Sequence, residues 1–211
     1  MQAERSEAIH TRLYLTHEDH GRALSWEEFA SADAEEGYRY EMIEGKVFVS
    51  PAANAPHNAF EMWLQQILSA YAREHPEILQ FVATRARLFL PDLEQGITAP
   101  EPDVACYAEY AANPYAPDVD WRDYSPILVV EVISADTADK DLVRNRRLYL
   151  QVPSVREYWI LDPREGVEGL TMLVYRRRGR RWAACLTIAP GETYTTPILP
   201  GFSLVLDPHA K

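Results

Sequence analysis

One glutamate of the sequence stands inside a strongly apolar segment. Glu131 lies within residues 127–133, which read Ile-Leu-Val-Val-Glu-Val-Ile. A carboxylate in such a segment is costly to bury unless it is paired, protonated or bound to a metal. The alternative is that Glu131 lies at a strand end and faces solvent or an arginine. The apolar residues on both sides favour the functional interpretation.

A second carboxylate, Asp103, follows Pro102 and precedes the apolar residues 104–107. A Pro-Asp pair alone is common in turns. Together with Glu131, Asp103 becomes a stronger candidate, because two carboxylates on adjacent strands can share a hard divalent cation, usually Mg²⁺. Such an ion can activate a water molecule and stabilise the charge of a phosphoryl transition state. The pair therefore indicates a metal site suited to phosphoryl chemistry.

These carboxylates need a sheet to hold them. The β-branched run 127–134 predicts a buried central strand, and periodic apolar residues predict a helix over 57–75. A second helix, 139–151, is ended by Pro153. The other predicted elements are a short helix capped by Ser25, a hairpin of 40–43 and 46–50 around Glu44-Gly45, and strands within 80–90, 101–107, 157–161, 169–176 and 182–188. This order predicts an α/β or α+β domain built on a mixed sheet.

The chain of 211 residues has the length of one domain with at most an extension. Residues 1–22 are polar without sustained periodicity, so we expect an extension there and a single domain over 23–208. We expect no membrane span, because no run of about 18 apolar residues occurs. We expect no secretory signal either, because the N-terminus lacks an apolar core. Two cysteines, Cys106 and Cys185, are too few for a disulfide framework, and reduced thiols are typical of a cytoplasmic protein.

The formal net charge is −11, from 21 basic and 32 acidic residues. Such a charge opposes nonspecific binding to nucleic acid, so a nucleic-acid role must rest on local basic residues. One basic cluster is Arg144, Arg146 and Arg147, which could contact phosphate groups. The other, within 176–181, could also contact phosphate groups, but we favour a solvated hairpin tip that protects a sheet edge.

Several short motifs occur in an order known from one family. They are YEMIEGK at 40–46, Ser50-Pro51 with His57, PDV at 102–104, VEVIS at 130–134, 141–149, VPSVREYW at 152–159 and LPGF at 199–202. Over residues 24–207 the chain thereby resembles a widespread family of putative restriction endonucleases within the PD-(D/E)XK nuclease superfamily. The resemblance implies a PD-(D/E)XK-like α/β fold with an added N-terminal helix and hairpin. It also implies an endonuclease that hydrolyses DNA with Mg²⁺, or alternatively Mn²⁺, and without an organic cofactor.

The resemblance also assigns residues to this site. Asp103 matches the metal-binding aspartate, and Glu131 matches the acidic residue of the (D/E)XK half. Glu44 matches an acidic position of the first hairpin, either as a third metal-site carboxylate or as a turn residue. The main-chain carbonyl of Val132 is a further candidate ligand. His57 matches a histidine that could contact a phosphate or a site carboxylate, or could only cap its helix.

The lysine of the superfamily is missing from its usual place. The position two residues after the acidic residue is Ile133, and the position of the family's helical lysine is Asn145. Asn145 shares a helical face with Leu142 and Tyr149, so we expect it to point at the site. An asparagine can position water but supplies no positive charge.

Two nearby cations are candidate substitutes for that lysine. Arg146 could stabilise negative charge but could not act as a base, and Lys140 could turn toward the site. The substitution of Asn145 also supports another class of function, a catalytically impaired nuclease fold that binds nucleic acid or a protein partner. Hydrolysis of a small phosphoester is a third alternative. The resemblance further suggests a symmetric homodimer.

Overall fold

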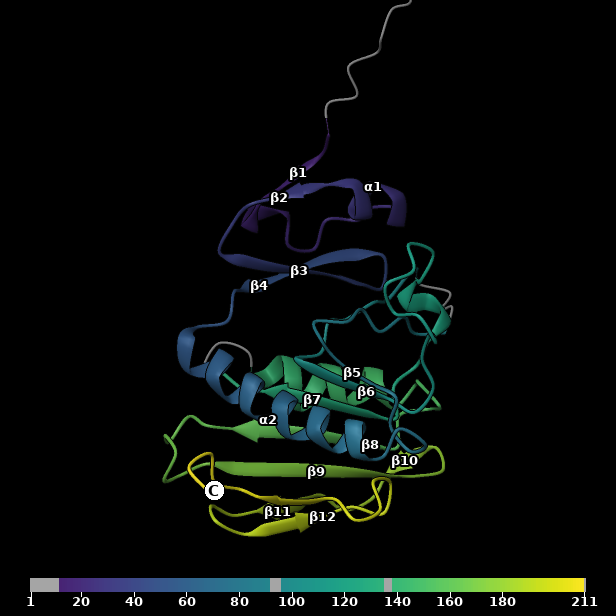
Figure 1. The fold of residues 1–211 in the computed structure, drawn as a ribbon. Helices are drawn as coiled ribbons and strands as arrows, with labels where there is room; N and C mark the ends of the chain where they lie inside the picture. Colours follow the sequence, from purple (N-terminus) through teal and green to yellow (C-terminus); the bar gives the residue numbers. More distant parts are fainter. Residues whose placement is uncertain (1–11, 92–95, 135–137, 211) are drawn as a thin grey trace, which may run out of the picture.

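The computed structural model describes residues 12–91, 96–134 and 138–210 (Figure 1). Its main sheet has the order β10-β9-β8-β7-β6-β5, with β11 beside β9. These strands are β5 (Phe81–Thr84), β6 (Val104–Tyr107), β7 (Leu128–Val132), β8 (Glu157–Asp162), β9 (Thr171–Arg178), β10 (Arg181–Trp182) and β11 (Leu186–Ile188). Only β7 and β8 pair in parallel among them. The predicted mixed α/β fold is confirmed.

Strand β7 lies at the centre of the sheet and is buried along its whole length. Successive side chains of a strand point to opposite faces. Leu128, Val130 and Val132 belong to the larger core cluster, whereas Val129 belongs to a second cluster on the other face. Glu131 therefore points toward the second face.

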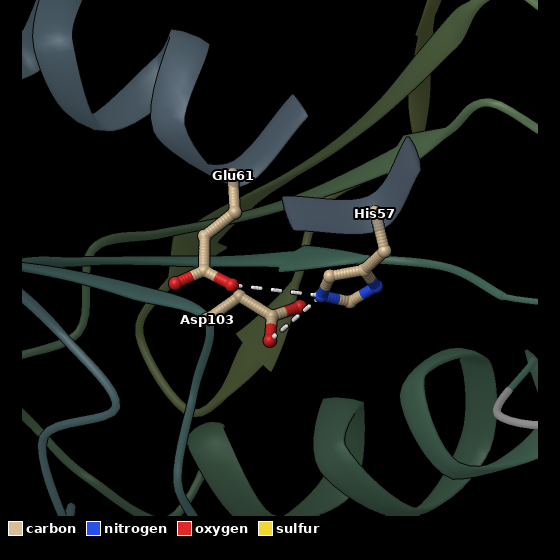
Figure 2. Close-up of side chains that lie close together, drawn as sticks. All are labelled: His57, Glu61 and Asp103. Atoms are coloured by element: carbon tan, nitrogen blue, oxygen red, sulfur yellow. Dashed lines mark ion pairs between the residues drawn. The ribbon is translucent and has the colours of Figure 1, made fainter. Parts of the chain in front are cut away.

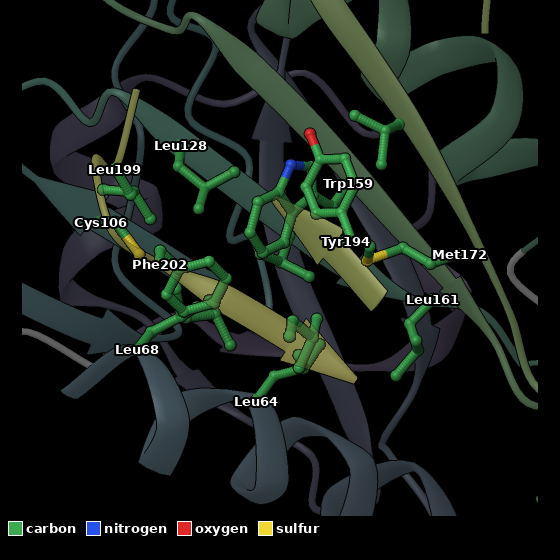
Figure 3. Packing of buried hydrophobic residues seen from close by; sticks show 14 of the residues in the cluster. Leu64, Leu68, Cys106, Leu128, Trp159, Leu161, Met172, Tyr194, Leu199 and Phe202 are labelled. Carbon is green, nitrogen blue, oxygen red and sulfur yellow. The ribbon is translucent and has the colours of Figure 1, made fainter. Parts of the chain in front are cut away.

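The long helix α2 (Ala55–Glu74) covers the first face of the sheet (Figure 1). It begins at the N-cap Asn54, whose side chain accepts a hydrogen bond from the His57 amide. Leu64 and Leu68 point from this helix into the main core, where Trp159 and Phe202 also pack (Figure 3). The apolar stripe predicted over 57–75 is thus the face that α2 buries.

The second face is covered by a segment that begins as a π-helix and continues as an α-helix. Residues Lys140–Asn145 form a π-helical turn, η3, and Arg146–Tyr149 continue it as α3. Leu148 and Tyr149 pack there against the second core cluster. The sequence predicts this helix over 139–151 but not its π-helical first half.

An N-terminal layer packs above the main sheet (Figure 1). It contains α1 (Trp26–Ser31), capped by Ser25 as predicted, and the hairpin of β3 (Tyr38–Ile43) and β4 (Lys46–Pro51). Glu44 and Gly45 form its turn with φ values of 52° and 70°. Leu15 is buried with this layer, so the described part of the predicted extension packs against the domain.

The remaining elements are short. They are β1 (Tyr14–Leu15) with β2 (Asp33–Ala34), β12 (Thr193–Thr195) with β13 (Ser203–Val205), and the 3₁₀ turns η1 (His17–Asp19) and η2 (Trp121–Asp123). Leu204 of β13 and Tyr194 of β12 extend the main core. Within the described residues, no helix is both long enough and apolar enough to cross a membrane.

Truncation of a core residue on α2 should reveal how strongly this helix is held. Leu64 is fully buried, whereas Met62 on the same helix is 58% exposed. Leu64→Ala should lower the free energy of unfolding by about 2–5 kcal/mol through lost burial and the cavity left behind. Met62→Ala should change it by less than about 1 kcal/mol. Urea denaturation measures both, and equal effects would contradict the packing of α2.

Candidate functional site

The two predicted carboxylates lie on neighbouring strand ends, where β6 begins and β7 ends. Val104 pairs with Val130 in the antiparallel ladder, and this register sets Asp103 opposite Glu131. Oδ2 of Asp103 accepts a hydrogen bond of 2.8 Å from the backbone amide of Val132. The sheet itself therefore brings these carboxylates together.

Helix α2 adds two side chains to Asp103, and Figure 2 shows both pointing toward it. Nε2 of His57 lies 3.2 Å from Oδ1 of Asp103 and 3.7 Å from Oε2 of Glu61. His57 and Glu61 are one helical turn apart, so they share a face. One ligand atom from each of these three buried residues lies within 4.8 Å of the others.

A buried arginine balances this acidic cluster. Arg39, on β3, donates a hydrogen bond of 2.7 Å to Oδ1 of Asp103, and its Nη2 lies 3.7 Å from Oε2 of Glu61. Removing one partner of a buried ion pair is destabilising, because the other charge is left uncompensated. Arg39 therefore ties the N-terminal hairpin to the site.

Glu131 is held from the opposite face of the sheet. Its Oε1 accepts hydrogen bonds of 2.6 Å from the Tyr149 hydroxyl and 2.8 Å from Nδ2 of Asn145. Nδ2 of Asn145 also donates to Oδ1 of Asp141 at 3.0 Å. Asn145 thus faces the sheet as its helical spacing predicts, and it bridges two carboxylates.

A further ion pair closes the site on the hairpin side. Arg144 contacts Oε2 of Glu41 at 2.6 Å, and Oε1 of Glu41 accepts a hydrogen bond of 2.9 Å from the amide of Glu101. Nε of Arg144 donates to Oδ1 of Asn145 at 2.9 Å, and its guanidinium group lies 4.1 Å from the ring centre of Phe48. Strand β3 and the π-helical turn are therefore joined through charged groups.

The carboxylates of the site respond differently to their surroundings. Burial opposes ionisation of Asp103, but its contact with His57 and the charges of His57, Arg39 and Lys140 outweigh burial and hold its pKa well below the usual range. Burial raises the pKa of Glu131 well above its ordinary value, and the charge of Asp141 adds to this. Burial also raises the pKa of Asp141 to about 6. Asp103 is thus held ionised, whereas Glu131 and Asp141 retain a proton more readily.

Six buried polar atoms of the site form no hydrogen bond among the described residues. They are Nε2 of His57, Oε2 of both Glu61 and Glu131, Nε and Nη2 of Arg39, and Nη1 of Arg144. Nε2 of His57 and Oε2 of Glu61 take part only in ion pairs. Buried polar atoms are rarely left unpaired, so such atoms call for an explanation. Imidazole nitrogen and carboxylate oxygens are suitable ligands for a divalent cation such as Mn²⁺, and carboxylates for Mg²⁺. The donor set therefore fits a divalent metal.

A cavity of about 50 Å³ lies beside His57 and Asp103. Its lining also includes Arg39, Asn54, Ser134, Lys140 and Asp141. A space of this size can hold an ion with its water ligands or a small anionic group. The cavity is thus the place where substrate could reach the carboxylates.

The family model that matches the chain describes Uma2, putative restriction endonucleases, and it covers residues 26–207. The chain belongs to the Uma2 family. This confirms the family resemblance inferred from the ordered motifs, is consistent with the restriction-endonuclease-like fold and supports a nuclease-like function. No match was found among curated proteins.

Other predicted residues of this Uma2 member lie further from the cavity. Glu44 lies at the hairpin turn, where its carboxylate pairs with Arg147 at 2.9 Å. Arg146 is exposed, and its guanidinium group lies 5.4 Å from the ring centre of Tyr175. It is Glu41, three residues before Glu44, that contacts the site residues.

The second arginine cluster is partly structural. Arg176 pairs with the buried Glu157 at 3.1 Å, and Arg177 donates hydrogen bonds to carbonyl groups around the end of α3, including those of Tyr149 and Val152. Arg180 and Arg181 are exposed, in keeping with the predicted solvated hairpin tip. These contacts leave the cluster apart from the carboxylate site.

Four site residues of the Uma2 chain were missed from the sequence: Arg39, Glu41, Glu61 and Asp141. Two of them carried a usable signal. Glu61 follows His57 by four residues on a predicted helix, and Asp141 precedes Asn145 by four. The hairpin residues carried none, because alternation along a strand does not tell which side chains reach a distant site.

The raised pKa of Asp141 predicts a pH dependence of stability. Between its ordinary value of 3.8 and about 6, the folded protein binds this proton more strongly than the unfolded chain does. The contribution of Asp141 to the free energy of unfolding therefore falls as pH rises through this window. In metal-free buffer, Asp141→Asn should become more stable relative to wild type between about pH 4 and about pH 7.

Urea denaturation across this pH range measures the difference. Asp118→Asn, on an exposed loop, is the matched control and should show the wild-type pH dependence. A constant difference between Asp141→Asn and wild type would contradict the raised pKa.

Proposed function

We propose that this protein is a metal-dependent endonuclease that hydrolyses phosphodiester bonds in DNA. The observation that carries the proposal is the placement of Asp103 and Glu131 at adjoining ends of two neighbouring strands, with a cavity that Asp103 lines. Membership of the Uma2 family supports the same class of reaction. A metal ion held by two neighbouring carboxylates could activate water for such hydrolysis.

Asp103 and Glu131 would hold the ion, Mg²⁺ or Mn²⁺, together with the carbonyl of Val132. His57 and Glu61 would supply further ligand atoms through Nε2 and Oε2, which lie in ion pairs but form no hydrogen bond. Once bound, the ion would lower the pKa of a water molecule and stabilise charge on the phosphoryl oxygens. Because the pairing with Arg147 occupies Glu44, that residue is not part of the proposed ligand set.

The residues around the carboxylates orient them. Arg39 and the Val132 amide fix the two oxygens of Asp103. Tyr149 and Asn145 bind Oε1 of Glu131, whereas its Oε2 forms no hydrogen bond among the described residues. Rigid placement of this kind contributes to catalysis, since a displacement of about 1 Å can cost about 100-fold in rate.

DNA is the proposed partner, with a homodimer as the proposed assembly. In a chain of net charge −11, contacts to phosphate must come from local cations, and Arg144 and Arg147 lie on the segment that borders the site. A symmetric dimer would present one site to each strand of a duplex. Both cysteines are free, in keeping with a cytoplasmic location.

Asn145 favours one second candidate function. Without a cation at that position, the fold would bind nucleic acid or a protein partner without hydrolysing a substrate. Such a module should bind DNA in a salt-sensitive manner and show no turnover. Binding without cleavage by the folded, metal-loaded protein would support this function over the nuclease.

The proposed nuclease predicts that Asp103→Asn abolishes cleavage. Plasmid and single-stranded DNA are incubated with purified protein in Mg²⁺ or Mn²⁺. We expect wild type to cleave, and Asp103→Asn to lose at least about 100-fold in rate because a carboxylate that binds the metal is removed. Glu131→Gln should behave in the same way.

The control for this experiment is Asp118→Asn, which removes a charge from an exposed loop and should cleave like wild type. Calorimetric titration with Mg²⁺ should show weaker binding for Asp103→Asn and Glu131→Gln, and unchanged binding for Asp118→Asn. Circular dichroism checks that each variant is folded. Unchanged metal-dependent cleavage by folded Asp103→Asn would overturn the proposed function.

A further inference from the structure

Lys140 is the lysine that the structure brings into the candidate site. The sequence contains three lysines, Lys46, Lys140 and Lys211. Lys46 is exposed on β4, and Lys211 lies outside the described residues. The side chain of Lys140 is only 8% exposed, and it lines the cavity together with Asp103 and His57.

The π-helical turn explains how Lys140 reaches this position. Its hydrogen bonds join residues five apart, so it is wider than an α-helical turn, and such turns frequently occur at functional sites. Lys140, Asp141 and Asn145 are all buried toward the sheet, whereas Val143 of the same turn is 61% exposed. One short segment thus directs a cation, a carboxylate and an amide at the same place.

The charges around Lys140 keep it a cation. Burial opposes its charge, but the carboxylates of Glu41, Glu131, Asp141 and Asp103 outweigh burial and raise its pKa above the ordinary value. Its ammonium group lies 3.5 Å from Oδ1 of Asp141. Lys140 is therefore suited to stabilise negative charge on a bound group, and it is not suited to act as a base.

The other cations of the site are each held by a carboxylate. Arg39 and Arg144 contact carboxylates at 2.7 and 2.6 Å, although Nε and Nη2 of Arg39 and Nη1 of Arg144 form no hydrogen bond among the described residues. Both hydrogen atoms on Nδ2 of Asn145 are accounted for by its bonds to Glu131 and Asp141. The ion pair of Lys140 is longer than those of the arginines, and Arg144 is not among the residues that line the cavity. Lys140 and Arg39 both line the cavity, so an anion that enters it would meet the ammonium group of Lys140 together with the guanidinium group of Arg39.

We propose that Lys140 is a catalytic residue whose ammonium group contacts the phosphate of the bound substrate. This inference rests on the proposed nuclease function. In the hydrolysis, a water oxygen bonds to phosphorus, the bond from phosphorus to the leaving oxygen breaks, and that oxygen takes up a proton. The products are a phosphate monoester and a hydroxyl group. Lys140 stabilises the negative charge that increases on the phosphoryl and leaving oxygens during this step.

The test compares DNA cleavage in Mg²⁺ by wild type, Lys140→Met and the matched control Lys46→Met. Loss of one stabilising group typically lowers the rate by about 100- to 1,000-fold, and we expect this for Lys140→Met. Lys46→Met should cleave like wild type, because Lys46 is exposed on β4. Lys140→Gln, which keeps a hydrogen-bond donor without the charge, should also lose activity and serves if the methionine variant fails to fold.

Calorimetric titration with Mg²⁺ distinguishes this role from an indirect one. Removing a cation from among carboxylates should leave Mg²⁺ affinity unchanged or increase it. Weaker Mg²⁺ binding by folded Lys140→Met and Lys140→Gln would overturn the proposal, since the lysine would then act by positioning the metal ligands.

A second variant tests whether the charge itself is required. Asn145→Lys, introduced into Lys140→Met, returns an ammonium group to the same helical face and should recover at least about 10-fold of the lost activity. Wild-type cleavage by folded Lys140→Met or Lys140→Gln overturns this inference while the nuclease function stands. No cleavage by wild type, with Mg²⁺ bound, overturns both.

Discussion

The burial of several carboxylates at the meeting point of β6 and β7 is the constraint on which the site depends. Asp103 and Glu131 lie opposite each other with almost no exposure, and like charges so placed repel. Each neighbouring layer supplies a cation or a hydrogen-bond donor that offsets this repulsion. Arg39 comes from the hairpin and His57 from α2, while Tyr149 comes from α3. The layers are therefore held together by the same groups that define the site.

The two faces of the sheet have different roles: one forms the main apolar core, and the other holds Glu131. The face beneath α2 forms the larger apolar core and supplies most of the buried hydrophobic contacts. The other face places Glu131 under a helical segment that carries polar groups inward. Helix α2 serves both tasks, because its first turn carries His57 to the cavity and its later turns carry Leu64 and Leu68 to the core. A stable core thus supports a site that is costly to bury.

The chain departs from its family at Asn145, and the structure gives that departure a physical meaning. The amide of Asn145 donates hydrogen bonds to both Glu131 and Asp141. It is a neutral group, whereas a lysine at this position would add a positive charge. Positive charge enters instead from Lys140 at the start of the π-helical turn and from Arg144 at its end. The overall acidity of the chain thus coexists with a locally balanced site.

The sequence by itself determined the elements and the two central carboxylates. An apolar run marks β7, a helical period marks α2, and Glu131 stands out because its neighbours are apolar. Arg39, Glu41 and the inward position of Lys140 were decided only by tertiary structure. The hairpin docks its edge on residues 97–99, with a bridge between Met42 and Ala99, and this docking selects which hairpin side chains reach the site. Local periodicity carries no information about such contacts, because they join residues about 60 to 100 positions apart in the chain.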